Sequence, residues 1–255
     1  MPRGTPWKIV TGSTVLRPLK TSETVARDIV HEIVSAGLGD GDSLPSEARM
    51  LEQYSVSRES LREGLRLLEA QGLITIRRGP GGGPVVGAVD PANLGRTSTL
   101  YYHLTGATYG ELFDAWGVAE GYLAERAARN EDRELVRATL QPYLVDGDVH
   151  EDSLEAFVRH HTHFHNVLGT LAGNRVMQLS LMSIGQIVTH HVVVTADPRN
   201  VRSMILDDHH EIARAVIAGK PVKARDEMRS HLRRVAEYYV SNSQDEVLDK
   251  LIEWH

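Results

Sequence analysis

Histidine is unevenly distributed along this sequence of 255 residues, and its spacing suggests metal chemistry. Of the thirteen histidines, twelve follow residue 90. His161 and His165 are four residues apart, which places both imidazoles on one face of a helix, within reach of a single metal ion. Further histidines stand in the segments Asp207–His210 and Met228–His231. Because histidines also cluster on solvated helix faces, the spacing alone leaves a metal site and an ordinary surface as open alternatives.

The rest of the composition limits which reactions and metal sites are possible. The chain has no cysteine, which excludes disulfides, zinc ribbons, iron–sulfur clusters and thiol nucleophiles. Acids such as Asp207 would support metal-activated water, so a helical metallohydrolase is one alternative. However, no H-E-x-x-H or comparable motif for a general base accompanies the histidines. We therefore expect that the protein is not an enzyme.

The charge balance differs between the two parts of the chain. The net charge of −6 comes from 28 Lys and Arg against 34 Asp and Glu. Residues 1–90 hold 11 of each sign, whereas residues 91–255 hold 17 basic and 23 acidic side chains. The acidic excess therefore does not argue against nucleic-acid binding by the first part. Neither a membrane span of ~20 apolar residues nor a secretory signal is present, which favours a cytoplasmic protein.

The capping and turn residues of the first part predict three helices followed by a hairpin. Thr21 or Ser22 is expected to cap a first helix, Ser46 a second, and a third helix follows Ser57. Residues 73–86 place a Gly-rich loop between two short apolar runs and predict the hairpin. This order predicts a winged helix-turn-helix.

Hydrogen-bond donors gather where the third helix begins. Ser57, Arg58, Ser60 and Arg62 lie at that end, and the two arginines share one helix face. In a helix-turn-helix, this end of the recognition helix meets base edges and phosphates, and arginine pairs bidentately with guanine. Arg78, beside Arg77, begins the wing and suits a phosphate contact. A solvated helix with ordinary surface arginines remains the alternative for each residue taken alone.

Three stretches of the first part resemble the DNA-binding domain of the GntR family. They are GDSLPSE at residues 41–47, VSRESLREGL at residues 56–65, and LEAQGL at residues 68–73 before the Gly-rich wing. The resemblance covers about residues 20–88. It implies that DNA is contacted by Ser57, Arg58, Ser60, Arg62 and, on the wing, Arg78.

One residue departs from the pattern of that family. Its members usually carry a basic residue directly after LPSE, where this chain has Ala48 followed by Arg49. Arg49 is the substitute that we expect to contact DNA, although it points about 100° away on a helix.

The second part is predicted to be helical and resembles the FCD domain, the effector-binding half of the FadR subfamily of GntR regulators. The resemblance lies in the opening helix from Glu111 to Glu120, in the Phe164–Asn174 segment, and most specifically in the segment from His209 to His231. In metal-binding members, an Asp and three His hold a divalent ion at the centre of the bundle. Carried over by position, the three histidines are His165, His209 and His231, and His161 occupies the position of the Asp.

The resemblance therefore implies a site of four imidazoles, His161, His165, His209 and His231. Imidazole ligands favour zinc, nickel or similar ions over magnesium and calcium, which prefer oxygen. A carboxylate from elsewhere in the chain would still be able to join the site.

A second departure concerns the effector. Many members place an arginine five residues after the first Glu of the opening helix, where this chain has Trp116. An indole cannot replace a guanidinium fork, so the implied pocket, with Trp116 and Glu120, suits an apolar effector or one bound through the metal. Packing of Trp116 in the core is the alternative.

The sequence thus predicts a mainly α protein with an N-terminal winged helix-turn-helix and a C-terminal, all-helical antiparallel bundle. We expect an arm at 1–20, the winged domain at 21–88, a linker with a short helix at 89–105, the effector domain at 106–240 and a tail at 241–255. The expected function is a DNA-binding repressor, homodimeric on a palindromic operator and controlled by a small-molecule effector. A metal sensor, in which the ion itself is the signal, is the main alternative.

Overall fold

The structure is a computed structural model that describes residues 17–79, 81–144, 153–191, 197–242 and 247–254. The chain divides into two compact units, Val10–Asn93 and Leu94–His255, and each is described by itself. Most of the expected N-terminal arm, residues 1–16, lies outside the described residues. No described helix is long and apolar enough to cross a membrane.

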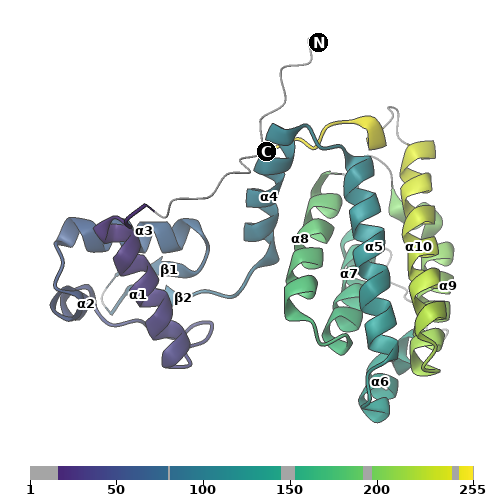
Figure 1. The fold of residues 1–255 in the computed structure, drawn as a ribbon, viewed down its shortest axis with the longest axis horizontal. Coiled ribbons are helices and arrows are strands. Elements are labelled where there is room, and N and C mark those ends of the chain that lie inside the picture. Colours follow the sequence, from purple (N-terminus) through teal and green to yellow (C-terminus); the bar gives the residue numbers. More distant parts are fainter. Residues whose placement is uncertain (1–16, 80, 145–152, 192–196, 243–246, 255) are drawn as a thin grey trace, which may run out of the picture. The chain divides into compact units, whose positions relative to one another are not determined.

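The first unit has the predicted order of three helices and a hairpin (Figure 1). Strands β1 and β2 pair antiparallel, with Ile74 opposite Val86. The wing therefore begins and ends beside the helices, and the winged helix-turn-helix is confirmed. The elements are α1 (Thr21–Ser35), α2 (Glu47–Tyr54), α3 (Arg58–Ala70), β1 (Ile74–Arg77) and β2 (Gly83–Val86).

Side-chain caps determine where two of these helices begin. The hydroxyl of Ser46 accepts from the backbone N–H of Arg49 at the start of α2, and the hydroxyl of Ser57 accepts from that of Ser60 at the start of α3. The prediction for α1 was wrong, because its N-cap is Lys20 and Ser22 is buried within the first turn. The carboxylate of Glu23, in the first turn, accepts from the backbone N–H of Lys20 at 2.8 Å, as the third residue of a capping box does.

The segment before α2 is hydrogen-bonded to the wing. The backbone N–H of Gly41 donates to the carbonyl of Val86, and that of Leu44 donates to the carbonyl of Pro84. These bonds extend the two-stranded sheet and place the start of α2 beside β2. The apolar core beneath this sheet edge consists of Val25, Ile29, Leu44, Met50, Leu61, Leu65, Leu68, Ile74 and Val86.

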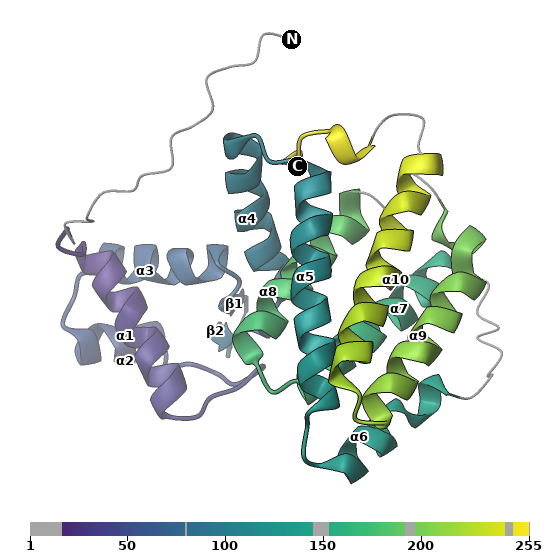
Figure 2. The same cartoon turned by 45° about the vertical axis from the view of Figure 1, so that its right-hand side comes forward.

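The second unit is an antiparallel helical bundle, as predicted (Figures 1 and 2). Helix α5 packs against α7, α8, α9 and α10 and so runs through its centre. Chain reversals fall at Gly173 and Gly219, whose φ angles of 66° and 62° favour glycine. The helices are α4 (Pro91–Thr105), α5 (Tyr109–Ala128), α6 (Arg133–Leu140), α7 (Leu154–Leu171), α8 (Arg175–His191), α9 (Arg202–Ile217) and α10 (Pro221–Asn242), with short 3-10 turns η1 (Gln141–Tyr143), η3 (Pro198–Val201) and η4 (Val247–Asp249).

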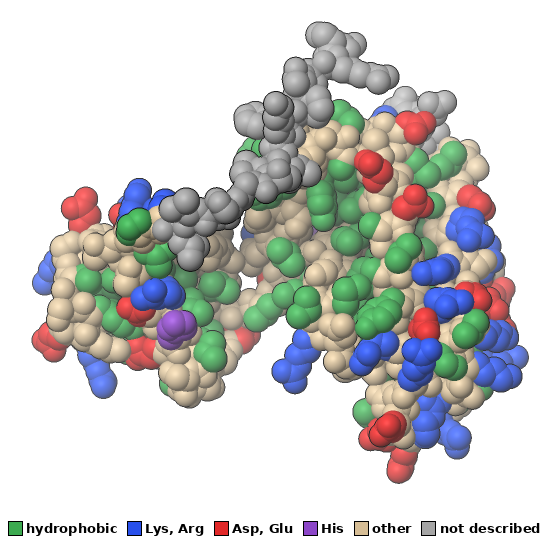
Figure 3. Space-filling view, viewed as in Figure 1, with side chains coloured by type: hydrophobic (Ala, Val, Ile, Leu, Met, Phe, Trp, Pro, Cys, Tyr) green, Lys and Arg blue, Asp and Glu red, His purple; other side chains and the backbone are tan. Residues whose placement is uncertain are grey.

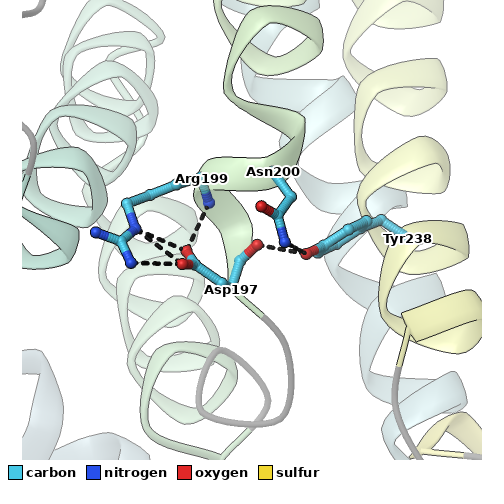
Figure 4. A network of polar contacts seen from close by, with 4 residues as sticks. All are labelled: Asp197, Arg199, Asn200 and Tyr238. Atoms are coloured by element: carbon cyan, nitrogen blue, oxygen red, sulfur yellow. Dashed lines mark hydrogen bonds and ion pairs between the residues drawn. The ribbon is translucent and has the colours of Figure 1, made fainter.

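A polar network joins the turn before α9 to α10 (Figure 4). The hydroxyl of Tyr238 donates to the backbone carbonyl of Asp197, and the side-chain amide of Asn200 donates to the same hydroxyl at 3.4 Å. The carboxylate of Asp197 accepts from the backbone N–H and the guanidinium of Arg199. This network ties η3, and with it the beginning of α9, to the neighbouring helix.

The C-terminal segment, which the sequence predicted only as a tail at 241–255, packs on its own bundle. The backbone N–H of Tyr109 donates to the carbonyl of Lys250, and that of Ile252 donates to the carbonyl of Ala107. Ile252 is only 1% exposed. Residues 247–254 therefore cover the first turn of α5.

The close approach of α1 and α3 yields a testable prediction. A Cβ on Gly64 would lie 2.9 Å from the backbone oxygen of Ser22, a contact that no side-chain motion relieves. We expect Gly64→Ala to lower the free energy of unfolding of the first unit by about 1–3 kcal/mol, measured by urea denaturation. Gly185→Ala in α8 is the matched control, since its Cβ would meet nothing within 4 Å and should stabilise by about 0.5–1 kcal/mol. Equal effects of the two substitutions would contradict the packing argument.

Candidate metal centre and nucleic-acid interface

Four histidines meet in the interior of the helical bundle. His161 and His165 come from α7, His209 from α9 and His231 from α10. One nitrogen from each ring lies within 4.8 Å of one nitrogen from every other ring. The exposed fractions of His165, His209 and His231 are 7%, 1% and 0%. The structure therefore brings together all four histidines that the sequence proposed as ligands.

Most of the imidazole nitrogens at this point are buried without a hydrogen-bond partner among the described residues. They are Nδ1 of His161, both nitrogens of His165 and of His209, and Nε2 of His231. An unsatisfied buried polar atom costs about 1–3 kcal/mol, so six together are a large penalty in an apolar core. Four converging neutral imidazoles are a donor set that fits a divalent transition metal.

The protonation state of the cluster agrees with that fit. Burial, followed by the mutual repulsion of the rings, lowers the pKa of His161 and of His209 well below the ordinary value of histidine. Burial also lowers the pKa of His231, against the opposing effect of a hydrogen bond to Asp208. These three rings are consequently neutral at pH 7, which is the form that binds metal.

Asp208 orients one ring of the cluster. Nδ1 of His231 lies 3.0 Å from Oδ2 of Asp208, and the guanidinium of Arg234 holds the same carboxylate. Although burial raises it, these hydrogen bonds lower the pKa of Asp208 on balance, so the carboxylate is ionised. Nδ1 of His231 is then the donor, and Nε2 faces the other three rings with its lone pair free. Sequence reasoning missed this role, because only the crossing of α9 and α10 pairs residues 23 positions apart.

Helix α5 adds a carboxylate and an indole beside the cluster. Nε1 of Trp116 donates to Oε1 of Glu120 at 3.2 Å, and Oε2 of Glu120 lies 3.3 Å from Nδ1 of His165. Trp116 is 5% exposed and its ring centre lies 5.9 Å from that of His165. Trp116 is thus both a core residue and a wall of the site, and Glu120 is positioned to orient His165.

A narrow cleft opens beside these residues. Its described lining includes Trp116, Glu120, His161 and His165 and otherwise consists of amides, hydroxyls and apolar groups, without Lys or Arg. Its volume of about 50 Å³ is small, so a ligand larger than a few atoms requires side chains to move. The amides and hydroxyls are those of Thr162, Asn166, Gln178, Gln186 and Thr189.

The residues expected to contact DNA lie at the surface of the winged unit. Arg58 occupies the first turn of α3, and its side chain is exposed, as are those of Arg49 on α2 and Arg78 on the wing. The hydroxyls of Ser57 and Ser60 are 3.0 Å apart, so the capping pair faces the same end of the helix. This arrangement presents donors at the start of the recognition helix.

Arg62 differs from the other arginines, because it has a partner within the unit. Its Nε donates to Oε1 of Glu47 at 2.6 Å, and the side chain of Arg62 remains largely exposed while that of Glu47 is partly exposed. An exposed pair contributes only ~0–1 kcal/mol, so a phosphate or base edge is able to compete for the guanidinium. Sequence reasoning did not foresee this pairing, which orients Arg62 toward the start of α2.

Comparisons with known proteins assign both units. Residues 21–82 match the family described as "Bacterial regulatory proteins, gntR family", and residues 111–234 match the FCD domain. The chain therefore carries a GntR DNA-binding domain followed by an FCD domain, a combination consistent with the FadR subfamily of GntR regulators.

Several curated relatives match most of the chain. Proteins named "HTH-type transcriptional repressor NanR" from Klebsiella aerogenes and from Escherichia coli K12 are 25% and 26% identical over 236 residues, which is 86% of this chain and 86% of each relative. The solved structure of a Streptococcus agalactiae GntR covers 84% of this chain and 98% of its own, at a TM-score of 0.60 and 24% identity, and supports the fold. The chain therefore carries the two domains of a DNA-binding transcription regulator with an FCD effector domain.

The buried neutral histidines predict how stability depends on pH. In the presence of a chelator, we expect the free energy of unfolding to fall as the pH drops below about 6.5, since the unfolded chain then binds protons that His161 and His209 refuse when folded. His209→Phe should reduce this dependence, because phenylalanine replaces the ring that stacks on Phe164 without adding a titrating group. Urea denaturation from pH 8 to pH 5 measures both, and equal pH dependence in the two proteins would contradict the assignment.

Proposed function

We propose that this chain is a repressor whose affinity for a palindromic operator is controlled by a small-molecule effector bound beside a metal ion. In this proposal His161, His165, His209 and His231 hold a divalent transition metal, zinc or nickel, in an effector domain that spans residues 106–240. The winged domain, residues 21–88, reads DNA, and two chains form the homodimer that matches the two half-sites.

The observation that carries the proposal is the convergence of four buried imidazoles with unpartnered nitrogens. A satisfied core histidine has a hydrogen-bond partner for each polar nitrogen, and these have almost none within the described part of the chain. The hydrogen bond between Asp208 and His231 supports it, because metal-binding histidines usually donate their second nitrogen to a carboxylate. Repression as the mode of action is supported by the name of the NanR relatives.

The donor set decides which ions fit. Imidazole nitrogen suits zinc and nickel, whereas magnesium and calcium need oxygen ligands that this cluster supplies only through Glu120. A bound ion of this class offers open coordination positions to an oxygen- or nitrogen-bearing effector.

The chain's own residues restrict the effector. Trp116 stands where many relatives in the family place an arginine. The described residues that line the cleft include neither Lys nor Arg. The nearest charged side chain is the carboxylate of Glu120. An effector held only by a salt bridge to the protein is therefore disfavoured, and one that offers a donor to Glu120 or an apolar surface to Trp116 is favoured.

Control of DNA binding follows from differential affinity. An effector that binds one arrangement of the dimer more tightly than the other shifts the population toward it, by no more than its ratio of affinities. The small volume of the cleft supports this coupling, because an effector must displace side chains of α5, α7 or α8 in order to enter.

The narrow cleft also supports a second candidate, a metal sensor in which the ion itself is the signal. The two functions differ in the response of operator affinity to free metal. The affinity of a sensor changes as the site fills, whereas a regulator with a resident metal responds to the effector only after the site is saturated. Operator binding measured across buffered metal concentrations, with no effector present, distinguishes them.

The recognition helix yields a prediction about DNA. We expect Arg58→Ala with Arg62→Ala to weaken binding to the promoter region of the protein's own gene by about 30-fold or more, because two charge-assisted contacts at ~1–3 kcal/mol each are lost. Fluorescence anisotropy with a labelled fragment measures the change. Arg137→Ala on α6, an exposed arginine of the helical unit, is the matched control and should leave the affinity unchanged. Undiminished binding by the double variant would refute the assignment of the recognition helix.

The histidine cluster yields a prediction about metal content. We expect His165→Ala with His231→Ala to abolish bound zinc or nickel in elemental analysis of the purified protein, because only two ligands remain. Far-UV circular dichroism verifies that the variant is folded.

A graded variant tests the same site more gently. Asp208→Asn should weaken metal binding about 10- to 100-fold in competition with a chromogenic chelator. Asp207→Asn, a change at the exposed neighbouring residue, is its control and should have no effect. A metal content in the double histidine variant equal to that of the unmodified protein would eliminate the proposed site.

A further inference from the structure

We propose that the groove between α5 and α10 is the surface on which a second copy of this chain docks, with the helices of the two copies antiparallel. The inference rests on the proposed function for the homodimer and adds the surface and the geometry.

The groove is wide and unfilled. Its volume is about 590 Å³, and it is lined by residues of α5, α10 and η4. On the α5 side, the lining of the groove includes Gly110 and Gly117, which have no side chains. A Cβ on Gly117 would meet nothing within 4 Å. Val118 is 58% exposed and Val240 is 44% exposed, and both line the groove. An apolar depression of this size is normally covered by a partner.

The charges at the groove are separated along the helices (Figure 3). Three acids, Asp114, Glu237 and Asp249, lie toward the first half of α5 and the end of α10. Two bases, Arg233 and Arg229, come about one and two turns earlier along α10 than Glu237. None of these five side chains has an ion pair within the described part of the chain, and all five are exposed. The groove therefore has an acidic end and a basic end that are both unpaired.

A second copy is the occupant whose charge fits both ends. A two-fold axis perpendicular to the groove brings the acidic end of one copy against the basic end of the other, and it does so twice. A partner of uniform charge would be repelled by one of the two ends. The same axis sets α5 and α10 antiparallel to their counterparts, which also opposes their helix dipoles.

The surface that α5 and α10 offer is large enough for a dimer interface. Helices of 20 and 22 residues are each ~30 Å long and ~10 Å wide, so together they offer about 600 Å² per copy. The resulting total of about 1,200 Å² is at the lower limit of stable, specific interfaces.

Two complementary charge-reversal variants test the arrangement. The first carries Arg229→Glu and Arg233→Glu, which makes both ends of the groove acidic, and the second carries Asp114→Arg and Glu237→Arg, which makes both ends basic. Light scattering coupled to size-exclusion chromatography should find the unmodified protein dimeric and each variant alone monomeric. The dissociation constant of each variant's dimer should be raised about 100-fold or more by the juxtaposed like charges. A 1:1 mixture of the two should again form dimers, each with one copy of each variant, because every contact then joins opposite charges.

The control variant carries Arg137→Glu and Arg175→Glu, at exposed positions of α6 and α8 outside the groove, and should remain dimeric. Dimers of either groove variant alone, with unchanged affinity, would overturn the proposal. So would a mixture of folded variants that stays monomeric, since the two-fold pairing requires it to recover. A monomeric unmodified protein would overturn both this surface and the homodimer, whereas DNA binding by Arg58 and metal binding by the histidines are measured separately.

Discussion

The convergence of four imidazoles in the middle of a helical bundle is the constraint on which the second unit depends. Burying polar nitrogens without partners is costly, and the bundle gathers six of them from α7, α9 and α10 at one point. The surrounding groups position the rings of this cluster. Asp208, held by Arg234, orients the ring of His231. Glu120 and Trp116 lie beside the cluster on the side of α5. The network around Tyr238 holds the beginning of α9, the helix that supplies His209.

The two units present their chemistry in opposite ways. The winged unit places its donors on the surface, where serine caps at the starts of α2 and α3 satisfy the backbone and leave the arginines exposed. The helical unit places its ligands in the interior, where burial keeps the rings neutral. The proposed function uses this difference, because DNA is reached from the outside and an effector would act on the packing within.

Several parts of the fold could be predicted from the sequence because they depend on local patterns. Glycine-terminated helices, the cap at Ser46 and the glycine-rich hairpin each follow from neighbouring residues, and the position of the histidines followed from resemblance to a family. The start of α1 was mispredicted, because Lys20 is the N-cap and its backbone N–H is held by the carboxylate of Glu23 rather than by a serine or threonine cap. The packing of the C-terminal segment was not predicted, because its few apolar residues indicate burial only when the first turn of α5 is present to receive Ile252.

The sequence by itself determined the class of the protein, the order of its elements and the identity of the four imidazoles. Helical spacing relates residues three or four positions apart, which was enough to pair His161 with His165. Only the tertiary structure decided that Asp208 holds His231, that Glu47 holds Arg62, and that unpaired acids and bases line opposite ends of one groove. The physical reason is that these relations join side chains across helix packing, and the way helices pack is a property of the whole bundle rather than of any segment.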